Sequence, residues 1–350
     1  MKLTNNLYTT ESVLKGHPDK MCDQISDLIL DAYLVLDEDA HVAVECLGCS
    51  NKIILAGELQ TRHDLNVEPR IIDYYHSIGY DDEISVINFI EKQSRQLYNA
   101  VERGGAGDQG IMYGYACNNP ETNYLPLGCY YANMLAKSID LYRDQTKNYL
   151  PDGKVQITAD NKEIKNVLIN VQHAEDCDLF ALSESIYENA VRKVIPNISR
   201  DIVRINKDTG FISGGFRNDT GLTGRKIAVD TYGGLTPHGG GAFSGKDPTK
   251  VDRSAAYMAR FVAKNIVANE YANECIVAVS YEFGEENPSM LTITTENPNI
   301  CTAWANNFFD FRPAAIIERL GLRKTRYLPT SVYGHFTNPN YPWETVVKLV

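Results

Sequence analysis

The 350-residue sequence has no hydrophobic run long enough to cross a membrane. A spanning helix needs roughly 20 consecutive apolar residues, and runs such as 277–280 are far shorter. The first six residues turn polar at once and lack the apolar core of a secretory signal. Positive charge is also scarce, because the formal net charge is -11, which argues against a general nucleic-acid-binding protein. We therefore expect a cytoplasmic protein that binds neither nucleic acid nor membranes.

Closely spaced cysteine pairs are nearly missing as well. Of the eight cysteines only Cys46 and Cys49 lie close together. A structural zinc site would need a second pair or nearby histidines at suitable spacing, and neither is present. With no export signal, reduced thiols are expected rather than a disulfide framework. We interpret the pair as partly buried strand cysteines.

What the sequence does have is three successive units with the same pattern, a helix followed by two strands and further helix. The predicted helices cover 17–36, 67–78, 130–142, 179–195, 247–269 with Asp247 as the N-cap, and stretches between 302 and 320. The predicted strands cover 42–47, 53–59, 155–159, 164–171, 276–283 and 290–294.

This recurrence predicts an α+β protein of three structurally similar α/β-sandwich domains, helix-hairpin-helix units related by pseudo-threefold symmetry. An apolar content of 43% is enough for each domain to bury a core. We place the domains at 1–103, 104–212 and 213–350, and allow for domains that are discontinuous in space.

Two glycine-rich connections, 103–110 and 233–245, are candidates for functional loops because glycine permits close backbone approach. The second continues to Lys246, Lys250 and Asp252 and opens a predicted helix, so its composition resembles a phosphate cradle. It lacks the Walker spacing, since no Gly-Lys-Ser or Gly-Lys-Thr is present, which disfavours a P-loop ATPase.

Two further segments carry charge beside glycine. Residues 16–20 place an imidazole, a carboxylate and an ammonium at a helix start, where the backbone dipole favours anions. The alternative is a solvated helix start in which Asp19 serves the helix end. Residues 219–226 end in Arg225 and Lys226 before a predicted strand over 227–231, and the alternative there is a charged hairpin end.

Together these segments resemble, in the same order, the signature segments of the methionine adenosyltransferases, also called S-adenosylmethionine synthetases. The resemblance covers nearly the whole chain and is carried by residues 16–20, 105–110, 221–226, 229–234, 238–257, 333–336 and 342–344. It implies that ATP, L-methionine and water give S-adenosylmethionine, phosphate and diphosphate, by thioether attack on C5′ of ATP and then hydrolysis of the triphosphate. A catalytically degenerate nucleotide-binding regulatory subunit and a plain ATP hydrolase or triphosphatase are the alternatives.

The resemblance also implies a set of site residues. The catalytic phosphate-binding residues would be His17, Lys154, Arg225, Lys226 and Lys246. The rest of the ATP site would be Asp152, Phe211, Asp219 and Ala242. Methionine would contact Glu58, Gln93, Asp108, Asp219 and Lys250. Asp19 and Asp252 would hold Mg²⁺, two ions per site, and Glu45 would hold K⁺ unless it is an ordinary exposed strand carboxylate.

The sequence departs from the family pattern at two places, and the resemblance also implies an oligomeric state. The lid expected at about 93–104 is short, and Gly210 stands where bacterial members commonly have an arginine, which removes one possible nucleotide contact. Members of the family form homodimers with active sites at the subunit interface, so we expect a homodimer and probable pairing into a homotetramer.

Overall fold

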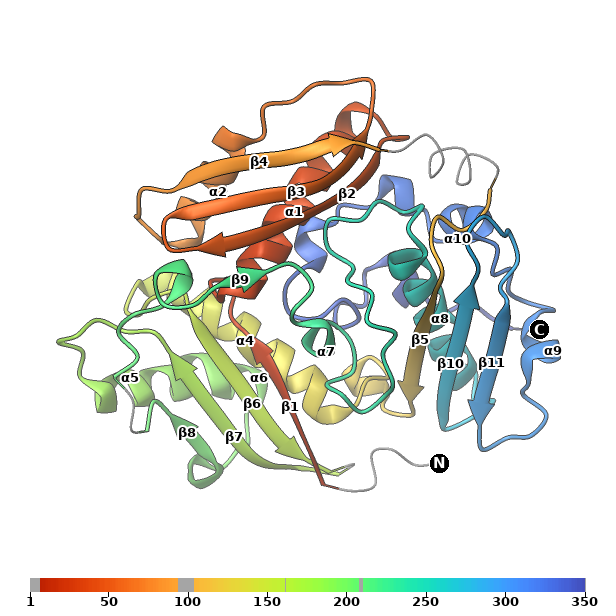
Figure 1. The fold of residues 1–350 in the computed structure, drawn as a ribbon. Helices are drawn as coiled ribbons and strands as arrows, with labels where there is room; N and C mark the ends of the chain where they lie inside the picture. Colours follow the sequence, from red (N-terminus) through yellow and green to blue (C-terminus); the bar gives the residue numbers. More distant parts are fainter. Residues whose placement is uncertain (1–6, 94–103, 161, 208–209, 350) are drawn as a thin grey trace.

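The computed structural model describes residues 7–93, 104–160, 162–207 and 210–349, which form three β-sheets that each carry helices (Figure 1). The predicted lid falls outside the described residues except for its ends, Gln93 and Gly104. In these four stretches no helix is both long and apolar enough to span a bilayer.

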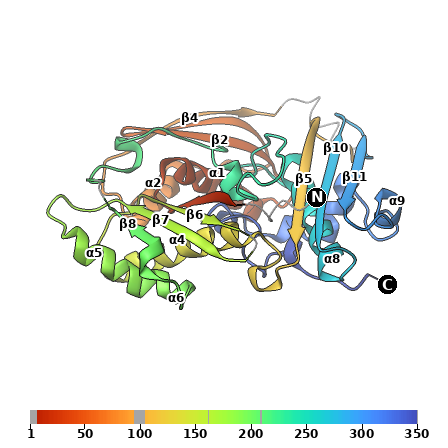
Figure 2. The same ribbon diagram turned by 90° about the horizontal axis from the view of Figure 1, so that it is seen from below.

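The first sheet has the strand order β4-β3-β2-β9. Its strands are β2 (His41–Cys49), β3 (Lys52–Gln60), β4 (Ser85–Lys92) and β9 (Gly221–Leu222). Helices α1 (Pro18–Leu36) and α2 (Glu68–Ile78) lie below it in Figure 2. Along β2, Val42 and Val44 are buried against this helical layer, whereas Glu45 is exposed on the opposite face. Among the described residues, no helix covers the outer face of the first sheet in Figure 2.

The second sheet has the order β1-β6-β7-β8, and the third the order β11-β10-β5. The strands of the second sheet are β1 (Tyr8–Val13), β6 (Gly153–Ala159), β7 (Ile164–Val171) and β8 (Val203–Ile205). Its helical elements are α4 (Leu127–Thr146), α5 (Leu179–Ile186), the π-helical turn η3 (Tyr187–Val191) and α6 (Arg192–Val194).

The third sheet consists of β5 (Gly110–Cys117), β10 (Glu274–Tyr281) and β11 (Met290–Thr295). Helix α8 (Val251–Ala268) packs on β5 and β10, and α9 (Thr302–Ala305) and α10 (Pro313–Arg319) follow. The short helix α7 (Ile227–Asp230) and six 3₁₀ turns complete the structure. The turns are η2 (Pro120–Thr122), η4 (Arg200–Ile202), η5 (Gly215–Arg217), η6 (Leu322–Lys324), η7 (Leu328–Thr330) and η8 (Pro342–Glu344).

Each of the three units lends its leading strand to a sheet of another unit. Strand β1 precedes α1 in the chain but pairs with β6, and β5 precedes α4 but pairs with β10. Strand β9 precedes α8 and closes the cycle by pairing with β2. All three exchanges are antiparallel and join the first strand of the recipient hairpin. The sheets are thus tied together in a ring.

The predicted α+β class with three similar α/β domains is confirmed. The predicted helices and hairpins are present, but β1, β4, β5, β8 and β9 were not predicted. The predicted strand over 227–231 is wrong, because Ile227–Asp230 is helical and its Asp230 is buried beside Lys20. Tertiary contacts here outweigh the strand preference of the β-branched residues.

The start of α8 also differs from its prediction. The N-cap is Lys250 rather than Asp247. The carboxylate of Asp247 accepts hydrogen bonds from the backbone N–H groups of Val42 (2.7 Å) and Thr249 (2.8 Å) instead. Asp247 thus fixes the glycine-rich connection against β2, and the helix begins one turn later.

Candidate active site

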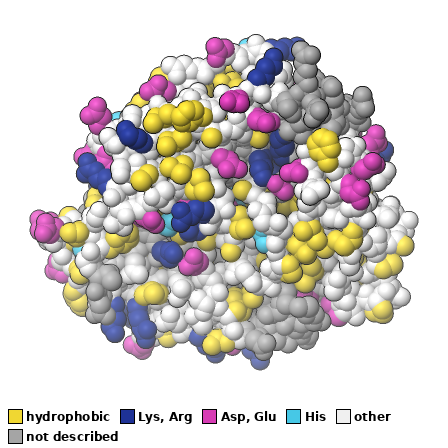
Figure 3. Space-filling model, viewed as in Figure 1, with side chains coloured by type: hydrophobic (Ala, Val, Ile, Leu, Met, Phe, Trp, Pro, Cys, Tyr) yellow, Lys and Arg dark blue, Asp and Glu magenta, His cyan; other side chains and the backbone are white. Residues whose placement is uncertain are grey.

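A cavity of roughly 540 Å³ opens beside the start of α1 and brings together five residues of the predicted ATP site. These are His17, Asp152, Lys154, Phe211 and Asp219. His17 precedes α1, while Lys154 projects from β6, so the cavity lies where the first helix meets the second sheet. Figure 3 shows basic side chains together with a histidine on this face, close to β9 as placed in Figure 1.

His17 is held in one protonation state at the mouth of the cavity. It is the N-cap of α1, and its Nδ1 accepts a hydrogen bond from the backbone N–H of Asp19 at 3.2 Å. Burial, together with the neighbouring charge of Lys226, lowers the pKa of His17 to about 3. The neutral ring therefore carries its proton on Nε2, which is left as a hydrogen-bond donor.

Asp19 gathers two predicted phosphate-binding cations at the same helix end. Its Oδ2 lies 2.6 Å from Nζ of Lys226, and its Oδ1 lies 3.3 Å from Nε of Arg225. Asp19 is only 2% exposed, and its Oδ1 also accepts from the N–H of Leu222 at 3.0 Å. A nearly buried carboxylate thus contacts two cations beside the cavity, the partly buried Lys226 and the half-exposed Arg225.

Lys246 and Asp252 form a second pair of the same kind. Nζ of Lys246 lies 2.5 Å from Oδ2 of Asp252, and both side chains are about one-fifth exposed. A β-carbon at Gly241 would collide with this carboxylate, and one at Gly110 would lie 3.5 Å from it. The glycine-rich connection therefore approaches Asp252 as closely as only glycine allows.

The connections that carry Lys226 and Lys246 are anchored to neighbouring turns of α1. The N–H of Gly224 donates to Oδ1 of Asp23, and the N–H of Gly245 donates to Oδ1 of Asp27, each at 2.8 Å. Four residues of α-helix rise about 6 Å. A β-carbon at Gly224 would also lie 2.5 Å from that of Ala242, a predicted ATP-site residue, so the two connections touch. Asp23 and Asp27 were not predicted.

Glu58 and Lys246 flank Ala43 in one row across the first sheet. Ala43 is in register with Glu58 on one side and forms a bridge to Lys246 on the other. Residues directly opposite one another in a sheet project from the same face. Glu45 stands two residues along β2, so it shares this outer face.

The remaining predicted methionine contacts differ in their surroundings. Lys250 is 8% exposed, and within the described part of the chain its ammonium contacts no hydrogen-bond acceptor. Gln93 is 5% exposed, and its amide oxygen and nitrogen have no partner among the residues that the structure describes. Asp108 is exposed just before β5, where its Oδ1 accepts from the N–H of Gln109 at 2.7 Å.

The carboxyl group of Asp152 titrates near neutrality. Burial raises its pKa to about 6, even though its Oδ2 accepts a hydrogen bond from the N–H of Gly215 at 2.9 Å. The nearby charge of Asp219 raises it further. Asp152 is therefore mainly ionised at pH 7 and mainly protonated at pH 5.

Metal binding by protein groups alone is not supported by the described residues. Within 7–93, 104–160, 162–207 and 210–349, no three His, Cys, Asp or Glu side chains gather as a metal site requires. Mg²⁺, however, is usually bound by one or two carboxylates together with substrate phosphates and water. Asp19 and Asp252 each supply one such carboxylate beside a predicted phosphate-binding lysine.

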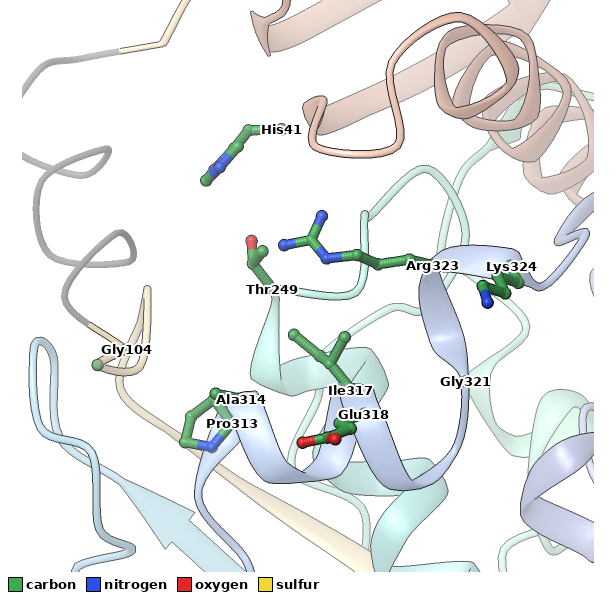
Figure 4. Close-up of a pocket in the computed structure, with 11 residues that line it drawn as sticks. His41, Gly104, Thr249, Pro313, Ala314, Ile317, Glu318, Gly321, Arg323 and Lys324 are labelled. Carbon is green, nitrogen blue, oxygen red and sulfur yellow. The ribbon is translucent and has the colours of Figure 1, made fainter.

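A second cavity, of roughly 520 Å³, lies between α10, the start of β2 and Gly104. Figure 4 shows His41 and Arg323 entering it from opposite elements, with Ile317 on its floor. The residues that line it include no predicted substrate or metal residue. It adjoins the predicted site through Thr249, which precedes Lys250 in the chain, and through Gly104 at the end of the predicted lid.

Comparison with known proteins identifies similar sequences along the whole chain. The family models for the N-terminal, central and C-terminal domains of S-adenosylmethionine synthetase match residues 5–100, 103–212 and 213–345. An S-adenosylmethionine synthase of Petrotoga mobilis is 42% identical, covering 98% of this chain and 97% of the relative. Those of Salinibacter ruber and Clostridium botulinum are each 40% identical, covering 98% of this chain and 96% and 97% of the relative.

Proposed function

We propose a role for each candidate site residue in the methionine adenosyltransferase activity of this enzyme, which belongs to the S-adenosylmethionine synthetase family. The proposal rests on one observation above all. The nearly buried Asp19 holds Lys226 and Arg225 at the N-terminus of α1, beside a cavity that contains His17 and Lys154.

The reaction needs positioned charge more than acid-base chemistry. The attacking sulfur of methionine is a neutral thioether with no proton to lose, so no general base is required in the first step. The barrier is lowered by aligning sulfur with C5′ of ATP and by stabilising the departing triphosphate. Groups that hold fixed positive charge or N–H donors near the phosphates therefore carry the catalysis.

The phosphate-binding groups in this proposal are His17, through Nε2–H, and the cations Lys154, Arg225, Lys226 and Lys246. In the free chain Lys226 pairs with Asp19, and Lys246 pairs with Asp252. A triphosphate with Mg²⁺ would suit both pairs, since each lysine could bind phosphate and each carboxylate could hold a metal ion. The same groups would hold the triphosphate while it is hydrolysed.

Asp19 and Asp252 are the proposed Mg²⁺ ligands, one for each of two ions. Held by these carboxylates, Mg²⁺ would neutralise charge on the phosphates. The chain's own contribution is to keep each carboxylate within contact of a lysine until the nucleotide arrives.

Asp152, Phe211, Asp219 and Ala242 are the proposed contacts for the nucleoside, because the first three line the cavity and Ala242 touches the neighbouring connection. Methionine presents both an ammonium and a carboxylate. Lys250, a buried cation with no acceptor in the described chain, suits the carboxylate. Glu58, Asp108 and Gln93, with Asp219, are proposed for the ammonium and the rest of the amino acid.

We propose a homodimer, paired into a homotetramer, that places the outer face of the first sheet at a subunit interface. On this face Phe89 is 62% exposed and lies beside Ala56, which is itself beside Glu45. Hydrophobic side chains gather over β3 and β4 in Figure 3. An interface there would bury them and bring a second protein surface to Glu45, the proposed K⁺ ligand. A cytoplasmic location is part of the same proposal.

The test is to incubate purified protein with ATP, methionine, Mg²⁺ and K⁺, and to measure S-adenosylmethionine by mass spectrometry and phosphate by colorimetry. Controls omit methionine or Mg²⁺. The proposal predicts sulfonium product that depends on both. Phosphate without sulfonium would indicate a hydrolase, and no product of either kind would indicate a nucleotide-binding regulatory protein.

A further inference from the structure

Four aspartates recur at every fourth residue of α1, at positions 19, 23, 27 and 31. A spacing of four places them on one face of the helix. Each accepts hydrogen bonds from the backbone of a segment that crosses this face. The donors are the N–H groups of Leu222, Gly224, Gly245 and, for Asp31, both Tyr327 and Leu328, at 2.8–3.0 Å.

Such a row is a costly way to hold a helix in a core. Like charges at this spacing repel one another, and buried carboxylates must be compensated by cations. Asp23 is compensated by Lys20 at 2.8 Å, and Asp27 by two contacts of 2.7 Å from Arg253. Both aspartates are at most 1% exposed. Apolar residues would pack there without these demands, so the carboxylates point to a role beyond packing.

The two middle aspartates hold the residues directly before the proposed phosphate-binding cations. Gly224 immediately precedes Arg225 and Lys226, and Gly245 immediately precedes Lys246. Both glycines have positive φ, 81° and 80°, so the chain turns sharply at each. The anchored N–H therefore fixes both the place and the direction from which the cationic side chain departs.

We propose that Asp23 and Asp27 are positioning residues of the reaction, which set the phosphate-binding cations of two separate connections at a fixed spacing along α1. The inference rests on the proposed roles of Lys226 and Lys246. Helix α1 then sets the distance between the cations of a triphosphate site. Asp23 acts through Lys226, and Asp27 acts through Lys246.

Asp31 offers a matched control within the same helix. Its two oxygens also accept backbone N–H groups, at 2.8 and 3.0 Å. The segment that it holds begins at Tyr327 and carries none of the proposed site residues. Loss of Asp31 should therefore lower stability without a comparable loss of turnover.

Asp23 is the better of the two positioning residues to test. Replacing Asp27 would leave the guanidinium of Arg253 buried without its carboxylate, whereas Lys20 keeps Asp230 when Asp23 is replaced. The set comprises Asp23→Ala, Asp23→Asn, Asp31→Ala, Lys226→Ala and the double variant of Asp23→Ala with Lys226→Ala. Turnover, KM for ATP and thermal midpoint are measured for each.

We expect Asp23→Ala to lower kcat by roughly 10- to 100-fold, the scale of a 1 Å misplacement of a catalytic group. Asp23→Asn retains an oxygen that can accept from Gly224, so it should recover most of that loss. Asp31→Ala should shift the thermal midpoint as Asp23→Ala does but keep kcat within about threefold. In the Lys226→Ala background, Asp23→Ala should cost much less than it does alone.

Additive losses in the double variant would overturn the inference, because Asp23 would then not act through Lys226. An equal loss of kcat in Asp31→Ala would overturn the inference as well. If Asp23→Ala does not fold, Asp23→Asn decides: a tenfold loss of kcat at an unchanged thermal midpoint would show that its charge, not its anchoring oxygen, matters. If Lys226→Ala alone has no effect, the proposed phosphate role fails, which separates that failure from failure of this inference.

Discussion

Replacing Lys246 by alanine tests the proposed phosphate site most directly. In the free chain its ammonium contacts Asp252 at 2.5 Å, with both side chains about one-fifth exposed. A partly exposed pair of this kind contributes at most about 1 kcal/mol to stability. The same ammonium, aimed at a departing triphosphate, is worth about 2.7–4 kcal/mol of transition-state stabilisation. Turnover should therefore fall roughly 10²- to 10³-fold while the fold is hardly affected.

The assay is the initial rate of S-adenosylmethionine formation at saturating ATP and methionine, followed by mass spectrometry. It should be repeated over a range of Mg²⁺, because the substitution also frees Asp252 to bind metal more strongly. Lys165→Ala is a matched control, since Lys165 also contacts two carboxylates, Asp160 and Glu163, but on an exposed hairpin. A turnover of Lys246→Ala within about threefold of the unaltered enzyme would refute the role assigned to Lys246.

Three further results are expected. Because burial raises the pKa of Asp152 to about 6 and the ionised carboxylate would be the stronger hydrogen-bond acceptor for the nucleoside, kcat/KM for ATP should decline as pH falls through 6. Asp152→Asn should remove that decline, while His17→Asn should retain it, because the pKa of His17 lies at about 3. Glu45→Gln should abolish activation in a K⁺ titration and leave the K⁺-independent rate. Phe89→Asp should shift the protein towards monomers in sedimentation velocity and lower activity with it, whereas unchanged assembly would argue against an interface on the first sheet.

The sequence predicted those parts of the fold whose signals are local. The helix at 17–36 has a continuous apolar stripe and a proline in its first turn, and the structure has α1 at Pro18–Leu36. The hairpins β2-β3 and β6-β7 also join strands that are neighbours in the chain. Periodicity is sufficient in such cases because the pairing partner is only a few residues away.

Features that depend on distant partners were missed. Strands β1 and β5 are recognisable only by their pairing with β6 and β10, which lie more than 100 residues further along the chain. The strand predicted at 227–231 failed for a similar reason, since Asp230 is fixed by Lys20 of α1. Asp247 looked like a helix cap but bonds to Val42 instead. Local propensity carries no information about such contacts.

The same distinction applies to the candidate site. The family resemblance indicated candidate site residues, and the structure gathers His17, Lys154 and Asp219 around one cavity. The role of Asp23 and Asp27 in holding the cation-bearing connections was not predicted, although the four-residue spacing of the aspartates is visible in the sequence. Their partners are backbone N–H groups some 200 residues away, which no side-chain pattern reveals.

The ring of exchanged strands explains why the site lies where it does. Strand β1 ends four residues before His17, β9 ends three residues before Arg225, and β5 begins two residues after Asp108. Each exchanged strand is thus flanked by predicted site residues at the point where the chain crosses from one sheet to another. A strand paired into its sheet leaves little freedom to the residues beside it, so the relative placement of the three sheets sets the distances between these groups. The fold therefore aligns the proposed phosphate-binding groups through the points where the chain crosses between sheets, an arrangement that no single domain could supply by itself.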